Sequence, residues 1–243
     1  MLLNADLGES YGKWEMGNDE AIMPYIDQAS IACGYHAGDP IVMQRCIQLT
    51  KMHDVSIGAH VAYPDIQGFG RRSMRIPEAE LVPIIMSQIA TLDGLARCAG
   101  TKVDYVKPHG ALYNDMMQSS DILQTVFKSI ANFHVPLTLM VQSLVDNSIV
   151  EKMSTQFNVR VIYEGFSDRG YNNDGLLQPR GKQGAVLNLQ ASVSRIKHLQ
   201  KFGNILSVDG KSLRLKIDSM CVHSDTQDAV NICQRIRELI DNA

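Results

Sequence analysis

Histidines and acidic residues in this sequence gather directly after short apolar segments. Four of the seven histidines stand at or near such positions, as do several carboxylates. Histidine titrates near neutral pH, so with carboxylates it can accept and donate protons, and the same groups suit a divalent metal ion. The spacing does not separate these uses, because His-x-Glu, His-Glu-x-x-His and Cys-x-x-Cys are all absent. The residues with this placement are Asp6, Glu9, His36, Asp39, His60, Lys107, His109, Glu164, Asp168, His223 and Asp225.

The clearest of these placements is that of His36. An apolar run suited to a buried strand leads into Gly34 and Gly38, which accept backbone angles that side chains resist. Asp39 followed by Pro40 is a typical helix start, because aspartate caps free N–H groups and proline suits the first helical position. His36 therefore lies on a short loop between a strand and a helix, where α/β proteins commonly place functional groups.

Cations accompany these histidines. Lys107 stands two residues before His109, and residues two apart on a strand face the same side. The pair could therefore present a cation and a base to one cavity, or Lys107 could simply pair with a buried carboxylate. Guanidinium groups in two long polar loops, 61–75 and 167–180, suit a carboxylate or a phosphate, unless they are merely solvated. They belong to Arg71, Arg72, Arg169 and Arg180.

The composition excludes several classes of function. A formal net charge of -3 gives no argument for binding nucleic acid or an anionic membrane surface, and no run of about 18 apolar residues is present. The five cysteines form no Cys-x-x-Cys pair, and the first residues lack the basic region of a signal peptide, so we expect reduced thiols in a cytoplasmic protein. Cys33 lies inside an apolar run, which favours a core thiol over a nucleophile. A phosphate loop of the Gly-x-x-x-x-Gly-Lys-Ser/Thr type is absent, so any nucleotide needs another cradle or another chain.

Apolar strand-like segments alternate with helix-like segments about seven times. Strands are predicted at 2–7, 29–33, 55–59, 103–106, 135–140, 159–163 and 220–222. Helices are predicted at 19–25, 40–53, 77–98, 112–117, 120–133, 145–156, 187–201 and 225–240. An Asp-Gly turn at 209–210, between 205–208 and 213–217, predicts an accessory hairpin near the C-terminus.

This alternation predicts a parallel sheet covered by helices. Polar residues follow every predicted strand except the fifth. The ends of barrel strands converge on one mouth, whereas an open sheet would spread these residues along an edge. The fingerprint Gly-x-Gly-x-x-Gly is also absent after the first strand. We therefore predict an α/β fold in which residues 1–243 form one domain, an irregular seven-stranded parallel (β/α) barrel.

Several stretches resemble the LamB/YcsF family. Among them are Asn-Ala-Asp-Leu-Gly-Glu-Ser at 4–10 and Val-Lys-Pro-His-Gly-Ala-Leu-Tyr-Asn at 106–114. The others are residues 31–40, 58–60, 63–72, 174–176 with 179–180, and 221–223. These matches run in order through nearly the whole chain, and several are long and rich in uncommon residue types.

The resemblance implies a barrel of the deacetylase-like type and an ATP-dependent reaction. In that reaction 5-oxo-L-proline is opened to L-glutamate, with ATP as co-substrate hydrolysed to ADP and phosphate. The resemblance also implies partner subunits of the PxpB and PxpC type. A divalent metal is possible, either Mg²⁺ with ATP or an ion held by Asp and His at the barrel mouth.

Two groups of residues match the needs of such a reaction. Proton transfer and charge stabilisation predict a catalytic group of Asp6, Glu9, His36, His60, Lys107 and His109. Binding of the substrate carboxylate or of phosphate predicts a second group of Arg71, Arg72, Asp168, Arg169, Arg180 and His223. Two alternatives stay open. One is a stand-alone metal-dependent deacetylase or amidohydrolase acting on a carbohydrate or small amide, and the other is a non-catalytic substrate-binding subunit.

Overall fold

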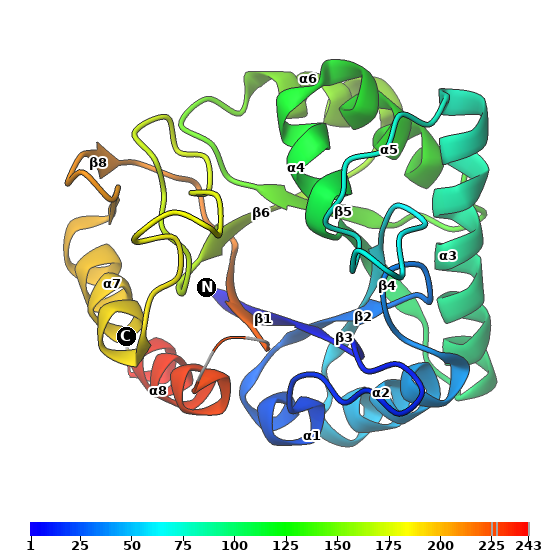
Figure 1. The fold of residues 1–243 in the computed structure, drawn as a ribbon, viewed down its shortest axis with the longest axis horizontal. Helices are drawn as coiled ribbons and strands as arrows, with labels where there is room; N and C mark the ends of the chain where they lie inside the picture. Colours follow the sequence, from blue (N-terminus) through cyan, green and yellow to red (C-terminus); the bar gives the residue numbers. More distant parts are fainter. Residues whose placement is uncertain (225, 227, 243) are drawn as a thin grey trace.

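Seven parallel strands close into a barrel in the computed structural model, which describes residues 1–224, 226 and 228–242. The strand order is β1-β2-β3-β4-β5-β6-β9, and β9 returns to pair with β1. The strands are β1 (Leu2–Leu7), β2 (Gln28–Ala32), β3 (Ser56–Val61), β4 (Val103–Pro108), β5 (Thr138–Gln142), β6 (Val161–Phe166) and β9 (Ser219–His223). The predicted parallel barrel is therefore confirmed (Figure 1).

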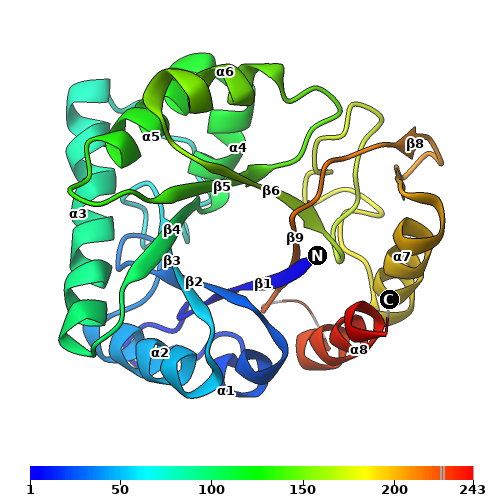
Figure 2. The same ribbon diagram turned by 180° about the vertical axis from the view of Figure 1, so that it is seen from behind.

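Helices surround this ring of strands, as both Figure 1 and the view from behind in Figure 2 show. They are α1 (Asp19–Ile22), the 3-10 helix η1 (Met23–Tyr25), α2 (Pro40–His53), α3 (Glu78–Cys98), α4 (Gly110–Gln118), α5 (Ser120–Ala131), α6 (Ser148–Phe157), α7 (Leu189–Phe202) and α8 (Ala229–Asp241). Helix α3 packs against α2 and α5, and α8 packs against both α7 and α1. The first and last helices of the chain thus lie next to each other on the outside of the barrel.

The turn from β2 into α2 has the predicted form. Asp39 caps the helix, its carboxylate accepting hydrogen bonds from the backbone N–H groups of Ile41 and Val42, both at 2.9 Å. Gly38 has a φ of 80°, and a Cβ there would lie 2.8 Å from the carbonyl oxygen of Ala32. A residue with a side chain would therefore be strained at this position.

Side chains alternate along the strands as expected for a barrel with helices outside and polar groups inside. In β1, Asn4 and Asp6 alternate with buried apolar residues, and both contact Lys107 of β4 across the barrel. Between β2 and β4, the buried hydroxyl groups of Ser30 and Tyr105 lie 3.1 Å apart. Polar side chains therefore line the inside of the barrel.

Helix α3 is the one helix in the described part of the chain that is long and apolar enough to cross a membrane. It packs instead against β3, β4 and α5, with Leu81, Ile85 and Ile89 fully or almost fully buried. The Gln88 side chain bonds both backbone groups of Ala62, at 2.8 and 2.9 Å. This helix is therefore part of the outer layer of the barrel, and it anchors the chain just after β3.

Most predicted boundaries shift by one to three residues, and larger corrections are needed near the fifth strand, the hairpin and the last helix. The fifth strand begins at Thr138 rather than at 135, because Pro136 has no N–H to offer a neighbouring strand. This strand ends at Gln142, which is polar. The expectation that the fifth strand contributes no polar residue at its end was therefore wrong. The hairpin is present but shorter than predicted, with β7 (Ile205–Leu206) and β8 (Ser212–Leu213). The last helix begins at Ala229. Asp225, a candidate in the sequence, lies outside the described residues.

Candidate active site at the barrel mouth

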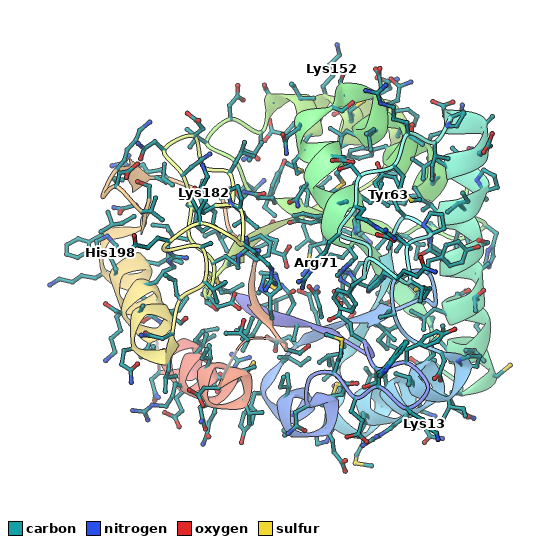
Figure 3. All side chains as sticks on the ribbon, in the orientation of Figure 1. Lys13, Tyr63, Arg71, Lys152, Lys182 and His198 are labelled. Carbon is teal, nitrogen blue, oxygen red and sulfur yellow. The ribbon has the colours of Figure 1, made fainter. Side chains whose placement is uncertain are left out.

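A cavity of about 360 Å³ opens at the carboxyl ends of the strands. Every strand-end region except that of β2 lines it, together with the loops after β3 and β6. Its charged and polar lining includes Asp6, Glu9, His60, Arg71, Lys107, His109, Tyr113, Asn114, Gln142, Arg169, Gln178, Arg180 and His223. Arg71 lies near the centre of the ring in Figure 3, whereas Lys13, Lys152 and His198 lie at the periphery.

Lys107 forms one wall of this site and is almost completely buried. Its Nζ lies 2.7 Å from Asp6 Oδ1 and 2.6 Å from Glu164 Oε1. Asn4 Oδ1 at 3.2 Å and Cys221 Sγ at 3.4 Å complete its surroundings. Burial opposes the charge on Lys107, but the carboxylates, Asp6 above all, outweigh it and hold the pKa well above its ordinary value. Lys107 therefore both pairs with carboxylates and lines the cavity.

A cluster of three histidines and Glu9 adjoins Lys107. His60 of β3 is the strand partner of Lys107, and its Nε2 lies 3.5 Å from Asp6 Oδ2. His60 Nε2 lies 3.0 Å from His109 Nδ1, and Glu9 Oε1 lies 3.3 Å from both His109 Nδ1 and His36 Nε2. The rings of His36 and His109 stack with centroids 3.7 Å apart and planes at 7°. Burial lowers the pKa of His36 and of His109 to about 3, and it lowers the pKa of His60 well below the usual value. All three rings are therefore neutral at neutral pH.

Backbone carbonyls fix the orientation of two of these rings. His60 Nδ1 donates to the carbonyl of Lys107 at 2.9 Å, and His109 Nε2 donates to the carbonyl of Phe69 at 2.9 Å. Phe69 has a φ of 53°, and Gly70 beside it has a φ of 64°. A Cβ on Gly70 would lie 2.8 Å from a ring carbon of His109. The loop after β3 thus folds tightly over the cluster because a glycine stands there.

Asp168 lies behind His223 and is completely buried. Its carboxylate accepts hydrogen bonds from His223 Nδ1 at 3.0 Å, from the His223 backbone N–H at 3.2 Å and from the Thr226 hydroxyl at 2.7 Å. Burial alone would raise the pKa of Asp168, but the His223 charge and these hydrogen bonds lower it to about 2. His223 thus lines the cavity, and Asp168 orients the His223 ring from behind.

Asp168 should make stability depend on pH. Because its pKa is lower in the folded chain, its ionised form contributes about 2 kcal/mol above pH 5. That contribution is lost as the pH falls from about 5 towards 2. Urea unfolding should therefore give a higher free energy of unfolding for the wild type than for Asp168→Asn at pH 6. This difference should shrink as the pH is lowered to 3. The exposed control Asp121→Asn should show no such difference, and a difference that widens towards pH 3 would contradict the assignment.

The arginines divide between the cavity and the surface. Arg71, Arg169 and Arg180 line the cavity, and the Arg169 guanidinium also bonds the carbonyls of Ala185 and Gln178. Arg72 is not among the lining residues in the described chain. Its side chain is 64% exposed and pairs with the buried Asp65 carboxylate, its Nε lying 3.0 Å from Oδ1. Arg72 therefore holds its own loop together.

Sequence reasoning gave no site role to three residues that the structure places at or beside the cavity. The Tyr113 hydroxyl donates to Glu164 Oε2 at 2.7 Å, and Gln142 lines the cavity at the end of β5. Glu164 was a candidate by its position only. Tyr113 lies on the apolar face of α4, where an aromatic residue looks like core, and Gln142 lay beyond the predicted end of its strand. His36 is buried behind His109 and does not line the cavity among the described residues.

Comparison with known proteins agrees with this architecture. The sequence model of the LamB/YcsF family matches residues 1–243. The chain belongs to the LamB/YcsF family. Its relatives include the 5-oxoprolinase A subunit of Vibrio campbellii, 42% identical over 98% of this chain and 94% of the relative. A 5-oxoprolinase A subunit of Pseudomonas aeruginosa, the one numbered 3, is 43% identical over 100% of this chain and 97% of its own length.

A solved structure shows the same fold. The lactam utilization protein from Thermus thermophilus superposes with a TM-score of 0.90 at 30% identity. The match covers 100% of this chain and 96% of that protein. The predicted membership of the LamB/YcsF family and the predicted barrel are thus both confirmed.

Proposed function

We propose that this chain is the A subunit of an ATP-dependent 5-oxoprolinase, which opens 5-oxo-L-proline to L-glutamate and hydrolyses ATP to ADP and phosphate. Support comes from relatives of that name that match it over almost their whole length. The observation that carries the proposal is the cavity, where a buried ammonium between two carboxylates faces neutral imidazoles and a third carboxylate. These are the groups needed to open a small cyclic amide.

The reaction places distinct demands on these groups. A lactam is an unreactive amide, and transfer of a phosphoryl group from ATP to its oxygen makes the ring carbon open to attack. Water then adds to that carbon and the ring C–N bond breaks, which leaves an acyl phosphate. A second water releases phosphate from it and gives L-glutamate. Asp6 lines the cavity as a carboxylate and can accept a proton from the attacking water. Lys107 can stabilise charge on the lactam oxygen.

Substrate binding falls to the loops around the mouth. We propose that Arg71 and Arg180 bind the substrate carboxylate or the transferred phosphate, because guanidinium groups suit both anions. Arg169 and His223 extend the same wall. The predicted binding residues Arg72 and Asp168 act indirectly, by holding the loop and orienting His223.

Partner subunits complete the proposal. The chain lacks a phosphate loop, so we propose that ATP is bound with the help of PxpB- and PxpC-type subunits docked over the mouth. Cys33, Cys46, Cys221 and Cys233 are free and buried, and Cys98 is free and exposed. Free thiols agree with the proposed cytoplasmic location.

The decisive experiment mixes the purified chain, alone and with its presumed partners, with 5-oxoproline and ATP. Glutamate and ADP should form in equal amounts in the complete mixture, and mixtures that lack this chain or its partners should form neither. Absence of glutamate in every combination would overturn the proposal. Glutamate release by the chain alone without ATP would instead indicate a metal-dependent amidohydrolase, the alternative that the histidine cluster favours.

A further inference from the structure

Two imidazole nitrogens in the cluster face each other at 3.0 Å, and neither carries a proton when both rings are neutral. His60 Nδ1 donates a hydrogen bond to the Lys107 carbonyl, and His109 Nε2 donates one to the Phe69 carbonyl. In neutral rings the remaining nitrogens, His60 Nε2 and His109 Nδ1, are therefore both acceptors, yet they lie 3.0 Å apart. Both side chains are at least nine-tenths buried, so a charged ring is costly there. Opposed lone pairs in a buried site need a cation between or beside them.

Glu9 directs a carboxylate oxygen to the same point. Its Oε1 lies 3.3 Å from His109 Nδ1 and 4.0 Å from His60 Nε2. Ligands at bond lengths near 2.0–2.1 Å around a tetrahedral ion are separated by about 3.3 Å. The three separations of 3.0, 3.3 and 4.0 Å scatter around that value. The trio is thus close to the arrangement of a two-histidine, one-carboxylate metal site.

His36 supports this trio but does not fit as a ligand. Its ring is nearly parallel to that of His109, with centroids 3.7 Å apart, so one ion cannot lie in the plane of both rings. In the neutral state its Nε2 instead donates to Glu9 Oε1 at 3.3 Å. Its Nδ1 has no hydrogen-bond partner among the described residues, as fits the acceptor side of a ring whose proton is on Nε2. His36 therefore orients the carboxylate from outside.

We propose that Glu9 Oε1, His60 Nε2 and His109 Nδ1 bind one divalent metal ion of the zinc type, with an open coordination position towards the cavity. The hydrogen bonds from both histidines to backbone carbonyls are the outer support that metal-binding histidines usually have. Imidazole ligands favour zinc and similar transition metals over Mg²⁺. An ion at this point supplies a Lewis acid that lowers the pKa of a bound water. The proposal concerns metal binding and stands whether or not the chain is a 5-oxoprolinase subunit.

A second group of possible ligands, Asp6, Cys221 and His223, is a weaker candidate. Lys107 already contacts two of its members, with Nζ 2.7 Å from Asp6 Oδ1 and 3.4 Å from Cys221 Sγ. A divalent ion would be repelled by that buried ammonium. The metal should therefore depend on the histidine cluster and not on His223.

Metal titration of the full chain tests the proposal. We would strip the Cys98→Ser protein, which lacks the exposed thiol, with a chelator and titrate Zn²⁺ and Mg²⁺ separately by calorimetry. One Zn²⁺ should bind per chain, with Mg²⁺ binding far more weakly. His60→Gln and His109→Gln should each lower the affinity for Zn²⁺ by more than about 100-fold. This exceeds the loss expected when only a hydrogen-bond partner of a ligand is removed. His36→Phe should weaken it less, and His53→Ala, on the exposed end of α2, should have no effect.

Histidine NMR of the unsubstituted chain gives a readout that does not depend on the folding of any variant. In a ¹⁵N-histidine spectrum, Zn²⁺ should shift His60 Nε2 and His109 Nδ1 while their protonated nitrogens stay protonated. No stoichiometric Zn²⁺ binding, with a proton found between the two rings, would overturn the proposal. Zn²⁺ binding that survives both glutamine variants, or that is lost in His223→Asn alone, would also overturn it.

Discussion

Lys107→Met should lower the free energy of unfolding by about 3–5 kcal/mol, because it leaves two buried carboxylates without their cation. In the folded chain Nζ lies 2.7 Å from Asp6 Oδ1 and 2.6 Å from Glu164 Oε1. Methionine keeps most of the side-chain length, so the loss reports the charge more than the packing. If the chain is a 5-oxoprolinase subunit, the variant should also lose ATP-coupled turnover in the complete complex.

Lys102→Met is the matched control for this change. Lys102 is 68% exposed and pairs with Asp104 at 3.3 Å, and such surface ion pairs contribute about 0–1 kcal/mol. Urea unfolding of both variants, with glutamate release as the second readout, separates the two lysines. A Lys107→Met protein with wild-type stability and full turnover would contradict both the buried ion network and its catalytic role.

Asp6→Asn should lower kcat in the complete complex by roughly 10²–10⁴-fold, the usual contribution of a general acid or base. Asparagine has almost the same shape as aspartate, and its amide oxygen can still accept the Lys107 hydrogen bond, so the cavity should stay intact. Burial would raise the pKa of Asp6, but the charges around it, including the Lys107 ammonium with its hydrogen bond, outweigh burial and lower that pKa. The variant removes the carboxylate charge at every pH, and KM should change much less than kcat.

Steady-state glutamate release at saturating ATP is the measurement for Asp6→Asn. Asp121→Asn, an exposed position in the first turn of α5, is the control and should keep wild-type kinetics. If Asp6→Asn retained full turnover while 5-oxoproline still bound to this chain, the chain would be a substrate-binding subunit. Catalysis would then belong to its partners.

The sequence was sufficient for the architecture because local signals agree with it. Alternating apolar segments predicted the parallel strands, and Asp39-Pro40 predicted the start of α2 at the residue where it begins. Asn18 likewise caps α1, its side chain accepting a hydrogen bond from the backbone N–H of Ala21. Boundaries failed where a local signal was ambiguous, as at the fifth strand, where the pairing of Thr138 with Tyr105 decides the register.

The sequence also showed which titratable side chains stand at the strand ends. His60, Lys107 and His109 follow or end their strands, and parallel strands bring such ends to one mouth. Closure of the barrel alone decided which atoms meet. Closure set Lys107 between Asp6 and Glu164, which lie far before and far after Lys107 in the sequence. Closure also brought Tyr113, on an apolar helix face, to the Glu164 carboxylate.

Tertiary structure therefore decided the partners, while the sequence determined the elements and the candidate residues. Arg71 and Arg72 are neighbours of identical type, yet Arg71 lines the cavity, whereas the exposed Arg72 side chain pairs with the buried Asp65. The facing lone pairs of His60 and His109 likewise depend on two backbone carbonyls contributed by Lys107 and Phe69. Periodicity and capping act over a few residues and can be read locally. Ring orientation and charge pairing depend on long-range register, which only the closed barrel sets.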